Sequence, residues 1–364
     1  MILGHGGNID ALANRIGCPV EDIIDMSCNL NPLGPPAGLE TFISRNIKKI
    51  RSLPQPDAAD MVHAFGGYYE VDPKRIMAGN GTTWFIYTLP LALKAKKVLI
   101  IGPTYSDYRD GCAMQNVAYA YSMTTFESDF KPDIQKISAL LSDKQAGFDT
   151  VILCNPNNPT GTLVETSILM DLLQAHKDVN FVIDESYLPF VKNARSLSLV
   201  AEDRFPNLIV LSSMSKIFRM PGLRTGFLCA DPRIIDAFNS FYQPWSVNAL
   251  AQAAVVHLLE NGEEINPFIE KTWNYIEKEK KIFLDSLMSL TSLKIFTSHT
   301  YFILARILCD IPSDSFCDAI GNEKILIRDC SNFEGLSNQF VRFSLKTRKT
   351  NTKLASLIKK IISG

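Results

Sequence analysis

Residues 150–161 read TVILCNPNNPTG: five uncharged residues, then an abrupt run of Asn, Pro and Gly. The same pattern, an apolar run followed by polar residues, recurs further along the chain as NFVIDESY at residues 180–187 and LIVLSSMSK at residues 208–216. A short apolar run without polar alternation is typical of a strand buried on both faces of a parallel sheet. Each of these three segments therefore predicts a buried strand that ends in a cluster of polar residues.

The sequence around these segments predicts an α/β fold with a mainly parallel sheet. Lys97–Ile101 (KVLII) and Gly226–Ala230 (GFLCA) have the same strand-like composition, and Thr166–Ala175 (TSILMDLLQA) has the spacing of an amphipathic helix. Strands that alternate with helices form βαβ units, which place helices on both faces of the sheet.

The two ends of the chain have a different pattern, which predicts a smaller α+β domain. An apolar stripe over Phe268–Leu290, interrupted by Lys280, predicts a helix. Strand-like stretches and a terminal helix follow at 293–296, 301–308, 325–328, 340–345 and 353–363. We therefore expect a large domain at 52–255 and a small domain formed by 1–51 together with 256–364.

Polar residues at the strand ends predict a ligand site. In open α/β sheets, ligands bind at the carboxyl ends of the strands. Three strands would bring an amide from 155–161, the carboxylate of Asp184 and the amine of Lys216 to one rim. Gly79–Thr83 (GNGTT) precedes an apolar helical stretch, so its N–H groups and hydroxyls could hold a phosphate at a helix N-terminus.

Composition excludes several other classes of protein. The 364 residues carry 37 Lys and Arg against 38 Asp and Glu, so the basic excess usual for nucleic-acid binding is missing. No run approaches the roughly 18–20 apolar residues that span a bilayer, and the N-terminus lacks the pattern of a signal peptide. The eight cysteines form no C-x-x-C pair, so no metal site is expected. We expect a cytoplasmic protein that binds neither membrane nor nucleic acid.

Four motifs, in this order, resemble the fold-type I pyridoxal-phosphate enzymes, which include the aspartate and histidinol-phosphate aminotransferases. The motifs are NPNNPTG at 155–161, DESY at 184–187, SMSK at 213–216 and PGLRTG at 221–226. The resemblance covers nearly the whole chain. It implies the fold of that family and pyridoxal 5′-phosphate as the cofactor.

The resemblance also implies a role for each residue type. Lys216 would bond covalently to the cofactor aldehyde, and Asp184 would keep the pyridine nitrogen protonated. Asn158 and Tyr187 would bind the phenolate oxygen, and Tyr105 would stack on the ring. The residues expected to hold the cofactor phosphate are Gly81, Thr82, Thr83, Ser213, Ser215 and Arg224.

Further motifs resemble the threonine-phosphate decarboxylases within this family. They are HGGNI at 5–9, DMSCNLNPLG at 25–34, QPWSVNALA at 243–251, and ILIRDCSNFEGL at 325–336 with VRF at 341–343. The resemblance implies that Arg342, helped by Asn29, binds a substrate α-carboxylate. Arg328 and His5 would bind a substrate phosphate.

This resemblance implies a decarboxylase for cobalamin biosynthesis. The substrate would be L-threonine O-3-phosphate, or L-serine O-phosphate, which differs by one methyl group. The alternative is a histidinol-phosphate-type aminotransferase, which would use the same machinery. A non-catalytic regulator that binds the cofactor is disfavoured, since the chain has no spare length for a DNA-binding module.

Several of these residues have simpler interpretations. Asp184, Thr82 or Thr83 could be a helix cap, and Tyr105 a turn residue. Arg328 could be a surface charge at a strand end, and His5 lies in a Gly-rich terminus.

One position departs from the family pattern and concerns assembly. Leu53 stands where the family has a tyrosine that crosses the homodimer interface to the cofactor phosphate. Tyr68 or Tyr69 could replace that tyrosine. The resemblance still implies a homodimer with sites between the subunits.

Overall fold

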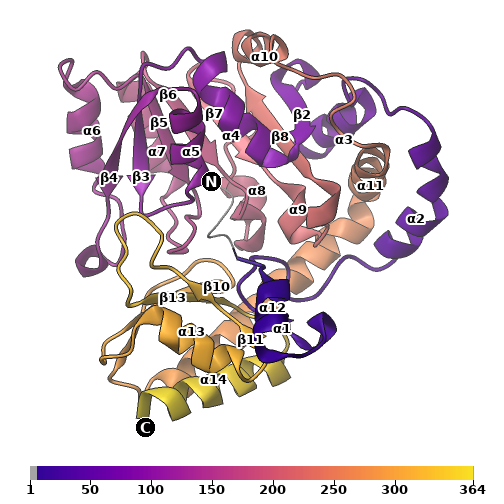
Figure 1. Ribbon diagram of the computed structural model, residues 1–364. Helices are drawn as coiled ribbons and strands as arrows, with labels where there is room; N and C mark the ends of the chain where they lie inside the picture. Colours follow the sequence, from indigo (N-terminus) through magenta and orange to yellow (C-terminus); the bar gives the residue numbers. More distant parts are fainter. Residues whose placement is uncertain (1–5, 364) are drawn as a thin grey trace.

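A seven-stranded sheet forms the centre of the protein in the computed structural model, which describes residues 6–363 (Figure 1). Its strand order is β2-β8-β7-β6-β5-β3-β4. The strands are β2 (Ile76–Asn80), β3 (Lys97–Gly102), β4 (Ala118–Met123), β5 (Thr150–Cys154), β6 (Asn180–Asp184), β7 (Leu208–Ser212) and β8 (Thr225–Ala230). β8 runs antiparallel to both of its neighbours, and the other pairings are parallel.

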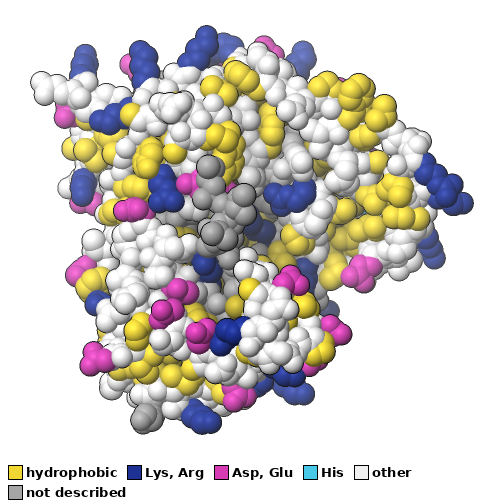
Figure 2. Space-filling model, viewed as in Figure 1, with side chains coloured by type: hydrophobic (Ala, Val, Ile, Leu, Met, Phe, Trp, Pro, Cys, Tyr) yellow, Lys and Arg dark blue, Asp and Glu magenta, His cyan; other side chains and the backbone are white. Residues whose placement is uncertain are grey.

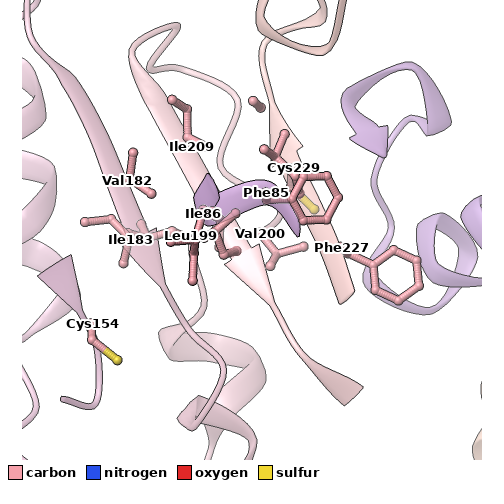
Figure 3. Packing of buried hydrophobic residues seen from close by; sticks show 14 of the residues in the cluster. Phe85, Ile86, Cys154, Val182, Ile183, Leu199, Val200, Ile209, Phe227 and Cys229 are labelled. Carbon is pink, nitrogen blue, oxygen red and sulfur yellow. The ribbon is translucent and has the colours of Figure 1, made fainter. Parts of the chain in front are cut away.

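Helices cover both faces of this sheet. They are α3 (Ala59–Tyr69), α4 (Gly81–Ala92), α5 (Asp107–Met114), α6 (Ile134–Ser142), α7 (Thr166–Ala175), α8 (Ala194–Leu197), α9 (Met214–Ile217), α10 (Pro232–Asn239) and α11 (Ala249–Glu260). All residues of β5, β7 and β8 are buried, as strands covered on both faces require. Figure 3 shows Phe85 and Ile86 of α4 among side chains from β6, β7 and β8.

The predicted buried strands are confirmed, and two strands were not predicted. β3, β5, β6 and β7 are parallel neighbours, and Gly226–Ala230 lies in the same sheet as part of β8. β2 has the sequence IMAGN, whose Gly and Asn suggest a turn rather than a strand. β4 (AYAYSM) is an edge strand whose side chains are mostly exposed or half-buried, and its Ala and Tyr residues differ from the β-branched and Leu residues of the buried strands.

The C-terminal part contains a four-stranded antiparallel sheet of order β12-β13-β10-β9. Its strands are β9 (Leu293–Ile295), β10 (Phe302–Ile307), β12 (Arg328–Asp329) and β13 (Phe340–Ser344). The N-terminal segment joins this part, because β1 (Ile24–Asp25) pairs in parallel with β11 (Ile325–Leu326). The remaining helices are α1 (Ile9–Ile16), α2 (Leu39–Arg45), α12 (Gly262–Leu287), α13 (Ser313–Gly321) and α14 (Arg348–Ser363).

The strand-like stretch predicted at 325–328 is confirmed as β-structure, but it is not one strand. The structure divides it between two sheets, since 325–326 pair with the N-terminal segment and 328–329 pair with β13. Long-range pairing decides this division, and the local composition carries no sign of it. The helix predicted over Phe268–Leu290 begins earlier, at Gly262, and the terminal helix begins at Arg348.

Helix α12 connects the two parts of the protein. Ile265 and Ile276 belong to the core beside the large sheet, whereas Phe283 and Leu287 belong to the C-terminal core. Lys280, which interrupts the apolar stripe, donates hydrogen bonds to the carbonyl oxygens of Ser298 and Thr300. Within residues 6–363, no helix combines the length and apolarity needed to cross a bilayer.

Candidate active site

A cavity of about 380 Å³ lies between the carboxyl ends of the large sheet and the C-terminal sheet. Figure 2 shows Lys and Arg side chains on both parts around the junction between them. The following predicted site residues all line the cavity: Asn29, Gly81, Thr82, Thr83, Tyr105, Asn158, Asp184, Tyr187, Ser213, Ser215, Lys216, Arg224, Arg328 and Arg342. His5 lies outside the described residues.

Asp184 is the last residue of β6 and is 4% exposed. Its Oδ2 accepts a hydrogen bond from the hydroxyl of Tyr108 at 2.8 Å, and its Oδ1 accepts one from the amide of Ser186 at 2.9 Å. The bond from Ser186 lies within the same turn, as expected if Asp184 only capped a local turn. The bond from Tyr108 comes from α5, a distant segment of the chain. A buried carboxylate held by two donors can stay charged beside a cationic ring nitrogen.

Sequence reasoning missed Tyr108. It lies three residues after Tyr105, in the first turn of α5, and is 1% exposed. From sequence alone, a tyrosine on an apolar helix face suggests a core residue. Only the packing of α5 shows that its hydroxyl reaches Asp184.

We expect Tyr108→Phe to lower the affinity for pyridoxal phosphate by about tenfold or more, because a hydrogen bond to a charged group contributes about 1.5–3 kcal/mol. Titration of cofactor-free protein with pyridoxal phosphate measures this. Tyr119→Phe is the control, since Tyr119 lies half-exposed on edge strand β4. Equal affinities of Tyr108→Phe and wild type would contradict a role for Tyr108 at Asp184.

Lys216 lies on α9, directly after β7. Its Nζ is 4.5 Å from the ring centroid of Tyr187. The hydroxyl of Ser215 bonds to the carbonyl oxygen and the hydroxyl of Thr225, both at 3.1 Å. This contact joins the lysine-bearing turn to β8 and fixes the start of the lysine side chain.

Residues Gly81, Thr82, Thr83 and Arg224 lie close together at the N-terminus of α4, and we call this group the Gly81–Arg224 cradle. Gly81 has φ +74°, and a Cβ there would lie 2.6 Å from an amino group of Arg224. A Cβ on Gly226 would lie 2.4 Å from the amide nitrogen of Thr82. Arg224 also donates to the hydroxyl of Thr83 at 3.4 Å. Helix N–H groups, hydroxyls and a guanidinium are the donor set that binds a phosphate dianion.

Two arginines face each other in the C-terminal sheet. The register pairs Arg328 of β12 with Arg342 of β13, so both side chains lie on the same face. Like charges directly opposite each other are destabilising, and an anion between them removes that cost. This arrangement therefore favours an anionic ligand.

Arg342 is nearly fully buried and held by two neighbours. It donates to Oδ1 of Asn158 and, at 2.6 Å, to the carbonyl oxygen of Ser27. Its Nε has no hydrogen-bond partner among residues 6–363. Because a buried donor without a partner costs about 1–3 kcal/mol, the Nε fits a ligand oxygen.

Arg328 is less buried than Arg342 and contacts different residues. It donates to Oδ1 of Asn332 at 2.7 Å and lies 5.2 Å from the ring centroid of Phe333. Burial lowers the pKa of its guanidinium. Arg328 therefore lines the cavity rather than standing as a surface charge.

The amide of Asn29 contacts the predicted cofactor site rather than the arginines. It donates to the hydroxyl of Tyr187 at 3.2 Å and accepts from Ser344 at 2.8 Å.

Tyr105 packs edge-on against Tyr108, with 5.9 Å between the ring centroids. Tyr68 and Tyr69 line a different cavity of this chain.

Residues 21–361 match the family described as aminotransferase class I and II. The chain belongs to this family. Its cofactor is pyridoxal 5′-phosphate. The residues present fit that cofactor: the Gly81–Arg224 cradle supplies donors for the phosphate, Asp184 a buried carboxylate for the ring nitrogen, and Lys216 an amine in the same cavity.

Relatives of this aminotransferase-family protein include decarboxylases and aminotransferases. It is 31% identical to the adenosylcobalamin biosynthesis bifunctional protein of Leptospira interrogans over 99% of this chain, and spans 41% of that protein. It is 28% identical to threonine-phosphate decarboxylase of Salmonella typhimurium over 99% of this chain and 97% of the relative. The solved histidinol-phosphate aminotransferase of Clostridium acetobutylicum is 29% identical, with a TM-score of 0.84 over 94% of this chain and 99% of that one.

Proposed function

We propose that the protein decarboxylates a phosphorylated hydroxy amino acid with pyridoxal phosphate. The substrate is L-threonine O-3-phosphate, giving (R)-1-amino-2-propanol O-2-phosphate, or L-serine O-phosphate, giving ethanolamine phosphate. The observation that carries the proposal is the pairing of Arg328 with Arg342 on one sheet face, in the cavity that also contains Lys216 and Asp184. A small molecule with a phosphate and a carboxylate needs two cationic anchors.

When bound, pyridoxal phosphate supplies an electron sink for the bond that breaks at the substrate's α-carbon. The carboxylate of Asp184, held by Tyr108 and Ser186, keeps a proton on the ring nitrogen. Arg342 holds the α-carboxylate with its Nε and so sets the direction of the bond to the leaving group. Lys216 would hold the cofactor before the substrate arrives, and its amine would supply the proton that the α-carbon needs.

Two charged residues of the cavity wall are largely shielded from water. Asp184 and Arg342 are each only 4% exposed. Electrostatic interactions are stronger in such surroundings than in solution. The guanidinium of Arg342 therefore fixes the orientation of the carboxylate more strongly than an exposed arginine would.

A histidinol-phosphate-type aminotransferase is the second candidate, because the solved aminotransferase and the Salmonella decarboxylase are similarly identical to this chain. Such an enzyme would use the same cofactor residues and an anion site. It differs in needing Lys216 to move a proton from the α-carbon, and in needing a keto acid as second substrate.

Supplying L-threonine phosphate as the sole substrate distinguishes the two candidates. We expect release of carbon dioxide and a phosphorylated amine without any keto acid. Histidinol phosphate with 2-oxoglutarate is the parallel reaction. Turnover of that pair, together with no carbon dioxide from either phospho-amino acid, would exclude the decarboxylase.

We infer a homodimer with two-fold symmetry from a group of exposed apolar side chains. Leu53 is 76% exposed, Ile50 66% and Trp245 50%. Trp245 lies beside the same segment, because its amide donates to the carbonyl oxygen of Pro56. In Figure 2, hydrophobic side chains gather at the right-hand edge, around α2. Apolar patches of this kind usually mark an interface.

Sedimentation of the purified protein should therefore give the mass of a dimer at micromolar concentration. Leu53→Asp should shift it toward monomer, since a charge in an apolar interface is costly. Asp57→Asn, in the same segment, is the matched control. A wild-type monomer that keeps full activity would contradict the dimer.

A further inference from the structure

A second cavity, of about 520 Å³, lies on the other side of the strand ends that form the active site. Successive residues of a strand point to opposite faces. Asp184 and Ser213 line the first cavity, whereas their neighbours Glu185 and Ser212 line the second. The two cavities therefore share the ends of β6 and β7 as a common wall.

Aromatic side chains form much of the second cavity. The rings of Tyr68 and Tyr69 meet at 80° with 5.0 Å between their centroids, which makes a corner. The indole nitrogen of Trp273 donates to the carbonyl oxygen of Pro189 at 2.8 Å, so the ring orientation is fixed. Leu188 and Ile269 add aliphatic surface.

The buried ionisable group in this cavity is the carboxyl group of Glu185. Glu185 is 4% exposed, and each of its oxygens accepts one hydrogen bond, from the amide of Leu199 at 2.7 Å and from Ser198 at 2.5 Å. A carboxylate has about four acceptor positions, so it can accept further donors. Burial raises the pKa of Glu185 to about 7. A cation beside this carboxylate would offset the cost of burying its charge.

The other charges at the cavity do not neutralise Glu185. Arg195 is the cation among the described lining residues, and it pairs with Glu70 at 2.7 Å. Glu270 adds a second carboxylate at the exposed side. No group of three or more metal-ligating side chains lies together within residues 6–363, which disfavours an inorganic cation.

We propose that this second cavity binds a small organic cation with an apolar body, such as an alkylated ammonium. Its charge lies against Glu185 and its body lies among Tyr68, Tyr69 and Trp273. Carboxylates and aromatic ring faces are the groups that bind organic ammonium ions. The site is independent of the decarboxylase proposal, since none of its residues is assigned to that reaction.

The test is calorimetric titration of the holoenzyme with benzyltrimethylammonium. This ion has an aromatic body and a permanent charge, and without an N–H group it cannot condense with the cofactor aldehyde. We expect saturable binding to one site per chain, and binding of the neutral analogue benzyl alcohol weaker by about tenfold or more. Saturating L-threonine phosphate should not displace the ion, because the active site lies across the strand ends.

Two variants locate the binding. Glu185→Gln removes the charge and should weaken binding by about tenfold or more. Ile269→Trp fills the cavity from α12, a different segment from the one that carries Glu185, and should abolish binding. This variant tests the site even if Glu185→Gln folds poorly. Glu264→Gln is the control, since Glu264 is an exposed carboxylate of α12 outside the cavity.

Four results would overturn the proposal. They are absence of any saturable binding to the wild type, wild-type affinity in Ile269→Trp, equal binding of the neutral analogue, and displacement by L-threonine phosphate.

Discussion

Replacing Lys216 with alanine should abolish covalent attachment of the cofactor and lower turnover by about 10³-fold or more, since a positioned proton donor alone contributes about 10²–10⁴-fold. The wild-type protein should be yellow, and borohydride should fix pyridoxal phosphate irreversibly to the peptide that contains Lys216. Mass spectrometry of digested, borohydride-treated protein measures the attachment in both proteins.

The control for this experiment is Lys192→Ala, because Lys192 is an exposed lysine outside the cavity. It should keep both colour and labelling. The assignment of Lys216 fails if Lys216→Ala decarboxylates at the wild-type rate, or if the borohydride label appears on another lysine of the wild type.

Arg328→Ala and Arg342→Ala should have different effects on two substrates. L-threonine phosphate carries both a phosphate and a carboxylate, whereas free L-threonine carries only the carboxylate. Arg328→Ala should therefore reduce kcat/KM for the phosphorylated substrate and leave free threonine nearly unchanged. Arg342→Ala should reduce kcat/KM for both, because we propose that its guanidinium, whose Nε has no hydrogen-bond partner among residues 6–363, binds the carboxylate that they share.

The expected losses are about tenfold to a hundredfold, because a charge-assisted hydrogen bond contributes about 1.5–3 kcal/mol and each 1.36 kcal/mol is a factor of ten. A two-by-two comparison of kcat/KM measures them. Arg306→Ala is the control, since Arg306 lies on the neighbouring strand β10 and bonds to Gln339 outside the cavity. Equal losses on both substrates for Arg328→Ala would mean that Arg328 is structural, and the phosphate must then bind elsewhere.

The buried strands and the polar clusters that follow them could be predicted because both are local properties. β5 and β7 are apolar over almost their whole length, and Asp184 and Lys216 stand at or just beyond strand ends. Parallel strands place such ends at one rim, so the sequence predicts which groups meet there. The antiparallel direction of β8 could not be predicted in this way, because its composition resembles that of the parallel strands in the same sheet.

Helix positions could be predicted where apolar residues recur every three or four positions along the chain. Thr166–Ala175 coincides with α7. The start of α12 was missed, because Gly262 and Pro267 disfavour a helix locally. Packing of Ile265 against the core outweighs that local preference.

The sequence alone was enough to establish the α/β class of this protein. It also established that an amide, a carboxylate and a lysine follow strands whose carboxyl ends share one rim of the sheet. Both features depend on residues that are close together in the chain. Tertiary structure decided the contacts between distant segments. Pairing of β12 with β13 sets Arg328 opposite Arg342, and packing of α5 brings Tyr108 to Asp184. The second cavity likewise needs Tyr69, Glu185 and Trp273 from three separate segments. Such contacts depend on the register and packing of elements that lie many residues apart, which no local pattern encodes.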